Sequence, residues 1–479
     1  MHPDTACRPA EAACRPADAT TRPADATTRP ADTSPPTARL DRRTFLSRAG
    51  RGVAATSLLG ALGHTARAAA PPRPRVCAVL TEFTYRSHAH VILENFLKPY
   101  LFNGQRTESG MDVVSFYVDQ FPERDMAREV AREFDIAIYP TIGEALTAGG
   151  DELAVDGVLS IGEHGQYPYN EKGQHLYPRK RFFDEIVATF RRTGRSVPVF
   201  SDKHLSYRGD WALEMVETAR EMGFPLMAGS SVPLAQRRPP LELPAGVQLV
   251  EAVSIHGGGV ESYDFHALEV LASQVEARRG GESGIAALQF LSGAALWQAA
   301  AEGRWSIELA EAAMAAELGQ QRPLRELVRE LKGDENALHG ILVEYRDGLR
   351  GTMLKVGDSG IRWNFACRVE GESAPRATSY YVGPWQNRNL FKALSHAIQS
   401  HIREGRAPYP VERTLLVTGA LDAAMDSRYR GEVRLDTPQL DVAYQPVDFR
   451  AMREMGATWQ IITEAMPEPP GIDTGLREG

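Results

Sequence analysis

The chain has 479 residues, with 54 lysines and arginines against 62 aspartates and glutamates, and a formal net charge of −8 at pH 7. Both charge signs are interspersed, which argues against a nucleic-acid-binding protein, because such proteins carry a basic face. Beyond the N-terminal segment no stretch is apolar over the roughly 20 residues that a membrane-spanning helix needs, so we expect no stable membrane anchor.

The first 40 residues form a low-complexity leader. A seven-residue unit repeats from Cys7, Cys14 and Thr21, and a partial copy starts at Thr28. It contains no bulky apolar residue that could be buried, so we expect residues 1–40 to be disordered. Alternatively, the repeat precedes the true start of translation and is not made at all.

Residues 41–70 have the features of a signal peptide. Arg42 and Arg43 are followed by a weakly apolar stretch over 52–62 and by small residues that end at Ala70. A charged region, a short apolar region and a small-residue cleavage site occur here in the typical order. We predict a twin-arginine signal, which is an address rather than an anchor. The translocase is then a partner, and the folded protein is periplasmic or secreted. The alternative is a chance arginine pair before an alanine-rich linker.

Between residues 71 and 229, strand patterns alternate with helical patterns. Strand patterns cover 75–80, 111–118, 135–139, 155–161, 197–200 and 225–228, and helical patterns cover 90–97, 123–134, 181–193 and 210–222. This alternation predicts a Rossmann-like α/β domain with a doubly wound parallel sheet. In such sheets ligands bind beyond the carboxyl ends of the strands, so the loops after Leu80, Ile161, Phe200 and Ala228 are the candidate site.

The pattern changes after residue 229. Helical patterns at 263–278, 285–300, 306–317 and 322–331 mix with strand patterns at 340–345, 351–355, 361–367 and 377–382, and helical patterns follow at 389–404 and 411–428. We predict an α+β domain over 230–430 with a mostly antiparallel open sheet, and a tail over 431–479 that wraps the surface. A free sheet face could pair with a second copy, so we also expect a homo-oligomer.

Two cysteines, Cys77 and Cys367, lie beyond the predicted cleavage site. Two cysteines cannot form a disulfide framework, and no cysteine spacing is typical of a four-ligand zinc site. A single disulfide between them is left open, because the predicted compartment is oxidising.

Three segments, in this order, resemble the glucose–fructose oxidoreductase, inositol dehydrogenase and MocA family (Gfo/Idh/MocA). The run 201–206 (Ser-Asp-Lys-His-Leu-Ser) stands where the family has Glu-Lys-Pro, and 225–230 is similar to its apolar strand ending in Val-Gly. The run 257–269 resembles the family's Gly-Gly-Gly…Asp-x-Gly-x-His-x-x-Asp segment. The resemblance covers most of residues 74–430. It implies an oxidoreductase that uses NAD or NADP on a sugar, a polyol or a related small hydroxylated substrate.

The resemblance places Lys203 and His266 on the family's catalytic pair and Glu269 on its trailing acid. A desolvated lysine can act as an acid or a base, and a histidine can move a proton near neutral pH. The loop from 163 to 181 is rich in ionisable groups and tyrosines, which suits a hydroxylated or anionic ligand. The candidate substrate-binding residues are Glu163, His164, Lys172, Tyr177, Arg179 and Glu269. We expect Lys203, His266 and at least two residues of this loop to line one pocket.

The loop after the first strand departs from the family. Residues 81–88 contain no glycine, whereas a Gly-x-Gly-x-x-Gly turn lets the backbone approach a pyrophosphate. Phe83 and Tyr85 would obstruct that approach, although the following helix N-terminus could still bind an anion. A dinucleotide is therefore implied by the resemblance and opposed by the local sequence. The candidate cofactor-binding residues are Thr81, Arg86 and Asp119.

Three functions remain open at this point. The first is the oxidoreductase. The second is a non-redox lyase, epimerase or hydrolase of sugars on the same scaffold, which the missing glycines favour. It could be metal-assisted, because imidazole and carboxylate side chains suit zinc or manganese. The side chains that could bind such a metal are Glu163, His164, His204, His256 and His266. We assign none of them as a metal ligand. The third is a catalytically silent sugar-binding protein. Fold alone decides none of these.

Overall fold

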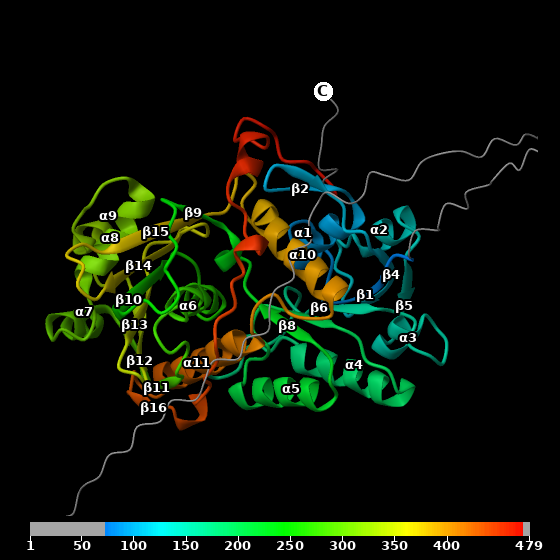
Figure 1. The fold of residues 1–479 in the computed structure, drawn as a ribbon, viewed down its shortest axis with the longest axis horizontal. Helices are drawn as coiled ribbons and strands as arrows, with labels where there is room; N and C mark the ends of the chain where they lie inside the picture. Colours follow the sequence, from blue (N-terminus) through cyan, green and yellow to red (C-terminus); the bar gives the residue numbers. More distant parts are fainter. Residues whose placement is uncertain (1–71, 473–479) are drawn as a thin grey trace, which may run out of the picture. The chain divides into compact units, whose positions relative to one another are not determined.

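The first sheet of the computed structural model, which describes residues 72–472, has six strands in the order β5–β4–β1–β6–β7–β8. Its neighbouring strands are parallel. Counted along the chain, the order is third, second, first, fourth, fifth and sixth, which is the Rossmann arrangement and confirms the predicted doubly wound sheet (Figure 1). The strands are β1 (Arg75–Leu80), β4 (Asp112–Val118), β5 (Ala137–Tyr139), β6 (Gly157–Ile161), β7 (Val199–Asp202) and β8 (Leu226–Gly229).

Both faces of this sheet are buried, because alternate residues of β1 enter different apolar layers. Val76 and Leu80 pack in the layer that contains α1, whereas Cys77 and Val79 pack with residues of α3, α4 and α5. Burial on both faces explains why β1 is an almost continuous apolar run in the sequence. The helices of this half are α1 (His88–Leu97), α2 (Ala127–Glu133), α3 (Ile142–Thr147), α4 (Arg179–Thr193) and α5 (Gly209–Glu221).

The second sheet has eight strands in the order β16–β11–β12–β13–β10–β14–β15–β9. The pair β10 and β13 is parallel and the other neighbours are antiparallel, which confirms the mostly antiparallel sheet. Its strands are β9 (Gln236–Arg238), β10 (Leu249–His256), β11 (Ile285–Ser292), β12 (His339–Tyr345), β13 (Arg350–Lys355), β14 (Trp363–Val369), β15 (Arg376–Tyr381) and β16 (Leu435–Asp436).

The predicted helix over 285–300 is wrong in its first half. Its first eight residues form β11, which pairs with β12 and β16, and Gly293 then turns the chain with a φ of 53° into α7 (Gly293–Ala301). The local sequence is rich in alanine and leucine, which favour helices, but pairing between strands overrides that preference. The sequence patterns also missed β10, which lies between β13 and β14.

Helices cover both faces of the second sheet. On β10, Ala252 packs in the layer of α6 (Ser262–Val275), whereas Val253 and Ile255 pack with residues of α7, α8 (Ile307–Leu318) and α9 (Leu324–Lys332). The sheet is open in the sense that it does not close into a barrel. Its faces are nevertheless occupied, so the expectation of a dimer through a free sheet face loses its structural basis.

Two long helices return from the second sheet to the first (Figure 1). The first, α10 (Asn387–Glu404), packs along α1, where Asn95 Nδ2 donates to Ser395 Oγ at 3.1 Å. The second, α11 (Val411–Tyr429), packs against α5 and α6, and Thr414 Oγ1 donates to the carbonyl of Ala228 at 3.1 Å. Thr414 also donates to Glu269, so α11 links the carboxyl end of β8 to α6.

The segment after α11 crosses from the second sheet to the first half of the molecule. Tyr444 OH donates to Glu276 at the end of α6, and farther along Trp385 Nε1 donates to the carbonyl of Met466 at 3.0 Å. The remaining short elements are the hairpin β2 (Tyr100–Phe102) and β3 (Gln105–Thr107) and the 3₁₀ turns Val232–Leu234, Pro438–Leu440, Arg450–Met452 and Ala457–Gln460.

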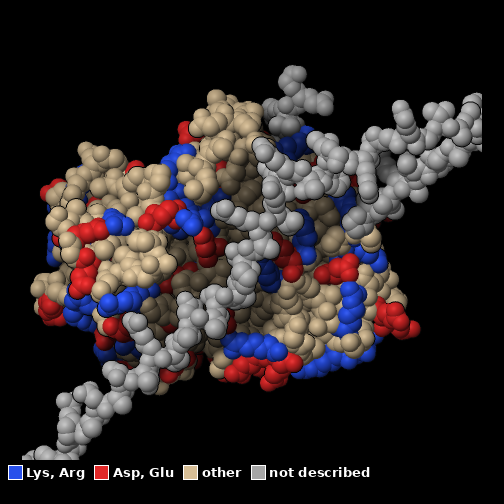
Figure 2. Space-filling view, viewed as in Figure 1, with Lys and Arg blue, Asp and Glu red and all other residues tan. Residues whose placement is uncertain are grey.

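The predicted leader (1–40) and signal peptide (41–70) lie outside the described residues. Within 72–472, no helix combines the length and the apolar character that crossing a bilayer requires. Cys77 and Cys367 are buried free thiols in different sheets, so the disulfide that was left open is not formed. Figure 2 shows acidic and basic side chains interspersed over the face that it draws.

Candidate functional site

The loops that follow β6 and β7 meet through a buried ion pair. Lys203, directly after β7, donates from Nζ to Glu163 Oε1 at 2.8 Å. Arg179, the first residue of α4, binds the other oxygen of the same carboxylate. We call the surrounding group the strand-end cluster, whose members are His88, Glu163, His164, Arg179, Asp202, Lys203, His204, Glu261 and His266. All members are buried except His164, which is partly buried.

The structure therefore brings five of the predicted site residues together: Glu163, His164, Arg179, Lys203 and His266. Burial alone would raise the pKa of the Glu163 carboxyl, but the charges of Lys203 and Arg179 hold that pKa well below its usual range. Burial, and then the nearby His88, lower the pKa of His164 to about 4. The Glu163 carboxylate is thus charged and the His164 ring is neutral at pH 7.

Three members of the cluster, His88, Asp202 and Glu261, were not predicted as site residues, and His204 was considered only in connection with a metal. His88 Nδ1 lies 2.6 Å from Asp202 Oδ2, and the His88 ring lies 5.0 Å from that of His164. Arg179 Nη1 lies 3.1 Å from His204 Nε2, and this nitrogen is 3.7 Å from Glu261 Oε1. Because the guanidinium can only donate, His204 Nε2 accepts and its Nδ1 carries the proton. Asp202 and His204 flank Lys203 in the sequence, which was the signal that could have found them.

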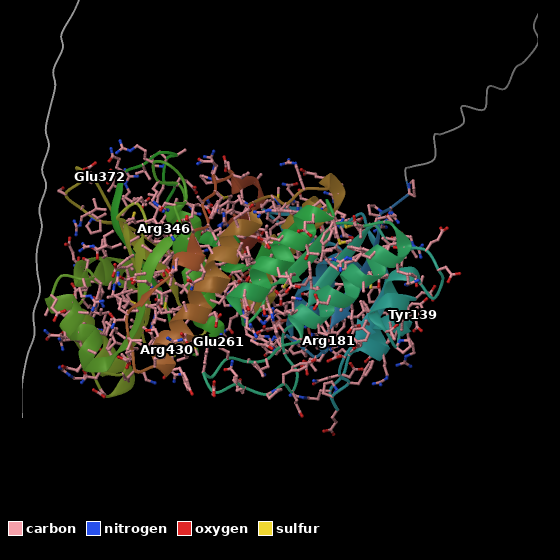
Figure 3. All side chains as sticks on the ribbon, turned by 90° about the horizontal axis from the view of Figure 1, so that it is seen from below. Tyr139, Arg181, Glu261, Arg346, Glu372 and Arg430 are labelled. Carbon is pink, nitrogen blue, oxygen red and sulfur yellow. The ribbon has the colours of Figure 1, made fainter. Side chains whose placement is uncertain are left out.

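Glu261 precedes α6 and caps it. Its side chain accepts a hydrogen bond from the backbone of Asp264, whose own carboxylate accepts from Glu261 N at 2.8 Å. Burial raises the pKa of Glu261 to about 7, although Arg179 and Lys203 oppose this rise. The carboxyl group is therefore close to half protonated at neutral pH, which suits a proton donor or acceptor. Figure 3 shows Glu261 in the middle of the molecule, between Arg181 of the first half and Arg346 of the second.

Backbone strain is concentrated in the same cluster. His164, Lys203 and Glu261 have φ values of 71°, 60° and 68°, in the left-handed region that side chains other than glycine seldom adopt. Each such residue costs on the order of 1 kcal/mol or more, and strain of this kind gathers at functional sites. All three residues are members of the strand-end cluster.

Several buried polar atoms of the cluster have no hydrogen-bond partner. Buried polar groups are nearly always paired, so a group of unpaired ones indicates a place where water or a ligand completes the pattern. The unpaired atoms are His164 Nε2, Arg179 Nε, Asp202 Oδ1, His204 Nδ1 and Glu261 Oε1.

His266 is held from behind by a chain of hydrogen bonds. Its Nδ1 lies 2.6 Å from Ser230 Oγ, and Ser230 N donates to Glu269 Oε2 at 2.6 Å. The other oxygen of Glu269 accepts from Thr414 at 2.6 Å. Both carboxylate oxygens thus bind protein groups, so the structure places Glu269 as a support for Ser230 and not in contact with a substrate. Gly229 makes this packing feasible, because a Cβ there would lie 2.8 Å from Glu269 Oε1.

Two predicted substrate-binding residues lie outside the cluster. Lys172 is ion-paired with Asp422 and Asp426 of α11 and lines a cavity of about 800 Å³. Tyr177 lies under the Arg179 guanidinium, 4.8 Å from it to the ring centroid, and lines a separate hollow of about 630 Å³. Lys172 and Tyr177 therefore line surface cavities, whereas the other predicted residues of the loop lie in the cluster.

The candidate cofactor-binding residues Thr81 and Asp119 are bound to other parts of the protein. At the switch point between β1 and β6, Thr81 Oγ1 donates to the carbonyl of Glu163 at 2.5 Å and ties the two loops together. Phe83 is fully buried in the core. Asp119, the expected ribose acid, accepts from Tyr167 OH at 2.6 Å and pairs with Arg181 Nη2 at 2.5 Å. These residues do not fit a bound dinucleotide.

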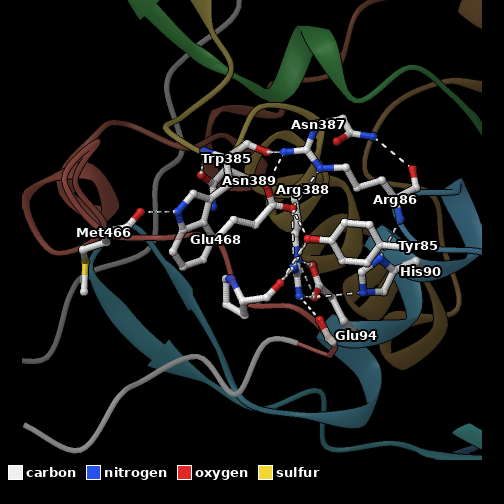
Figure 4. Close-up of polar contacts among 12 residues, drawn as sticks. Tyr85, Arg86, His90, Glu94, Trp385, Asn387, Arg388, Asn389, Met466 and Glu468 are labelled. Atoms are coloured by element: carbon white, nitrogen blue, oxygen red, sulfur yellow. Dashed lines mark hydrogen bonds and ion pairs between the residues drawn. The ribbon is translucent and has the colours of Figure 1, made fainter.

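Arg86, the last predicted cofactor residue, binds the C-terminal tail (Figure 4). Its Nε donates to Glu468 Oε1 at 2.8 Å, and Tyr85 OH donates to the same oxygen at 2.8 Å. Arg388 of α10 binds the neighbouring carbonyl of Pro469 and pairs with Glu94 of α1. The anion at the start of α1 is thus a carboxylate supplied by the chain itself.

Among residues 72–472, no three members of the strand-end cluster bring metal-ligand atoms within 4.8 Å of one another. Among residues 72–472, the group with three suitable ligand atoms within 4.8 Å is His256, Asp264 and His339. The Nε2 atoms of His256 and His339 each lie 2.8 Å from Asp264 Oδ1. His256 Nδ1 accepts a hydrogen bond from Gly258 N at 3.1 Å. A neutral ring that accepts at Nδ1 carries its proton on Nε2, so His256 donates to Asp264 and offers no lone pair to a metal.

No protein-family model and no curated protein matches this sequence. Among solved structures, the fold is similar to myo-inositol dehydrogenase from Lactobacillus casei in complex with NAD(H) and myo-inositol, at 13% identity over 76% of this chain and 96% of that chain, with a TM-score of 0.48. GenD2 from gentamicin A biosynthesis in complex with NAD is 14% identical over 76% and 96%, with a TM-score of 0.47. An oxidoreductase from Agrobacterium radiobacter in complex with NAD+, L-tartaric acid and magnesium is 12% identical over 76% and 98%, with a TM-score of 0.46.

Proposed function

We propose that the protein is an enzyme that performs acid–base chemistry, without nicotinamide, on a sugar, a polyol or a related small hydroxylated molecule. The observation that carries this proposal is the strand-end cluster, in which strained backbone, unpaired buried polar atoms and a carboxyl group with a pKa of about 7 coincide. Such a coincidence is typical of active sites. The substrate class rests on the family resemblance of the sequence.

The residues of the cluster would have different roles in the reaction. Glu261 exchanges a proton with the substrate, because its carboxyl group is available in both protonation states near pH 7. Lys203 and Arg179, fixed by Glu163, supply donors that stabilise negative charge developing on a substrate oxygen. His266, which Ser230 orients, is neutral because burial and the charge of Lys203 keep its pKa well below the usual range. A lyase, an epimerase or a hydrolase could use this set.

The cavity of about 800 Å³ is the proposed entry to the cluster. Its wall contains Lys172 from the loop that also carries Glu163, and Tyr207 from the loop that follows Lys203. Trp211 also lines it and lies 5.3 Å from Tyr207 between ring centroids. Aromatic rings beside ionisable groups suit a hydroxylated ligand, and movement of the two loops would pass that ligand to the buried cluster.

The second candidate function is the NAD- or NADP-dependent oxidoreductase. The observation that favours it is the Rossmann strand order of the first sheet. The two candidates differ in what the purified protein contains. Absorbance near 340 nm and mass spectrometry of molecules released by denaturation should detect no nicotinamide. A stoichiometric nicotinamide nucleotide in that extract would replace the first proposal with the second.

A further inference from the structure

A second cavity, of about 510 Å³, lies at the other end of α6. Its wall includes Arg237 of β9, Glu276 at the end of α6, and Arg453 of the C-terminal segment. Ten residues of helix separate Glu276 from His266, which corresponds to about 15 Å along the axis. The cavity is therefore distinct from the strand-end cluster and shares no residue with it.

Two buried arginines of this cavity share one carboxylate. Arg237 is 6% exposed and Arg453 is 2% exposed. Arg453 contacts Glu242 through both terminal nitrogens, at 2.9 Å and 2.7 Å, and Arg237 Nη1 lies 3.3 Å from the same carboxylate. The Nε atoms of both arginines are buried without a hydrogen-bond partner. One half-exposed glutamate thus faces two buried guanidinium groups.

The other acidic groups of the cavity wall are already paired. Glu276 binds Arg413 of α11, with Oε2 2.8 Å from Arg413 Nε, and Asp448 binds Arg450 at the exposed rim. These pairs leave Glu242 alone to balance Arg237 and Arg453, so one positive charge is in excess. Within residues 72–472 no ion pair joins the adjacent Glu454 to either arginine, and its oxygens accept instead from Gly456 N at 2.7 Å and from Thr458.

A buried cation without a matching anion is costly, which is why such charges are normally paired or ligand-bound. Burial, together with the charges of Arg453 and Arg413, lowers the pKa of Arg237, as expected where positive charge is in excess. The rest of the wall is largely apolar and includes Leu243, Pro244, Val447 and Phe449. The volume exceeds what a simple inorganic ion fills and is of the size that small ligands occupy.

We propose that this cavity binds a small organic anion, with Arg237 and Arg453 holding its carboxylate or phosphate group and the apolar wall contacting its body. Arginine suits this role because its planar guanidinium group donates to paired oxygens. Glu242 is then an internal competitor, since it occupies the terminal nitrogens that a ligand oxyanion would bind. The proposal goes beyond the proposed enzyme activity and does not depend on it.

Calorimetric titration of the full chain with benzoate and with inorganic phosphate, at low salt, tests the proposal. Benzoate presents a carboxylate on an apolar body and phosphate presents an oxyanion alone, so their order of affinity shows which chemistry the cavity prefers. We expect saturable binding of at least one probe. E242Q, which frees both arginines, should bind it at least about tenfold more tightly, because a charged hydrogen-bonding competitor has gone.

The matched variants are R453Q and R450Q. R453Q should bind at least about tenfold more weakly, whereas R450Q, which changes an exposed rim arginine, should stay within about twofold of wild type. If R453Q folds poorly, E242Q still tests the proposal, because its expected effect is tighter binding. E261Q should bind like wild type, which separates this site from the active one. The proposal would be overturned if neither probe bound saturably, or if E242Q bound the probe with the same affinity as wild type.

Discussion

Changing Glu261 to glutamine should remove a pH dependence from the stability of the protein. Burial raises the pKa of this carboxyl group from 4.5 to about 7 in the folded state. A group whose pKa is raised by folding contributes stability that is fully present below its unfolded pKa and is lost as the pH rises through its folded pKa. The window is therefore pH 4.5 to about 7. One unit of pKa corresponds to about 1.4 kcal/mol, so the wild type should lose about 3 kcal/mol across this window through Glu261.

The glutamine variant stays uncharged at every pH, and its amide oxygen can still accept the capping hydrogen bond from Asp264. E261Q should therefore match the wild type near pH 4.5 and exceed it by up to about 3 kcal/mol at pH 8. Urea unfolding followed by tryptophan fluorescence at intervals of pH measures the difference. E214Q, an exposed change on α5, is the matched control and should run parallel to wild type. If E261Q also runs parallel to wild type from pH 4.5 to 8, the assignment of Glu261 as a buried, proton-exchanging group is wrong.

Three further predictions concern other parts of the account. Lys203→Met should lower the free energy of unfolding by about 2–3 kcal/mol, because it removes a buried charged hydrogen bond while Arg179 still pairs with Glu163. Lys180→Met, which breaks a pair with exposed carboxylates, should cost less than about 1 kcal/mol, and equal costs would refute the reasoning. Calorimetric titration with NAD(H) or NADP(H) should give no micromolar binding, because the candidate cofactor-binding residues Asp119 and Arg86 are already ion-paired within the protein; a clean isotherm would contradict this. Changing both Arg42 and Arg43 to lysine should leave the protein in the cytoplasm, as measured by cell fractionation. Unchanged export of this variant would refute the twin-arginine proposal.

The sequence predicted the first sheet well, because its strands are buried on both faces and separated by periodic helices. Strand β1 was assigned with its observed bounds for this reason. The second sheet was harder to predict. Strands such as β11 contain alanine and leucine, and pairing with distant strands decides their conformation.

The site was predicted in part for a similar reason. Glu163 and Lys203 were found because adjacent parallel strands bring their following loops together. Their burial was not predictable, because it depends on how the two loops pack in the folded chain. Glu261 was missed as a site residue because its backbone strain and buried carboxyl group exist only in the folded chain. The pairing of Arg86 with Glu468 could not be predicted either, because the two residues lie 382 positions apart in the sequence.

The most direct test of the central claim is proton NMR in D2O on a panel of aldoses, uronates and polyols, mixed with the purified protein and no added nucleotide. This measurement detects bond cleavage, epimerisation and exchange of carbon-bound hydrogen for deuterium in one experiment. The account predicts conversion or exchange of at least one panel member by the wild type, with loss of that conversion in E261Q while E214Q retains it. Conversion that requires added NAD or NADP, or that E261Q catalyses as well as wild type, would contradict the account.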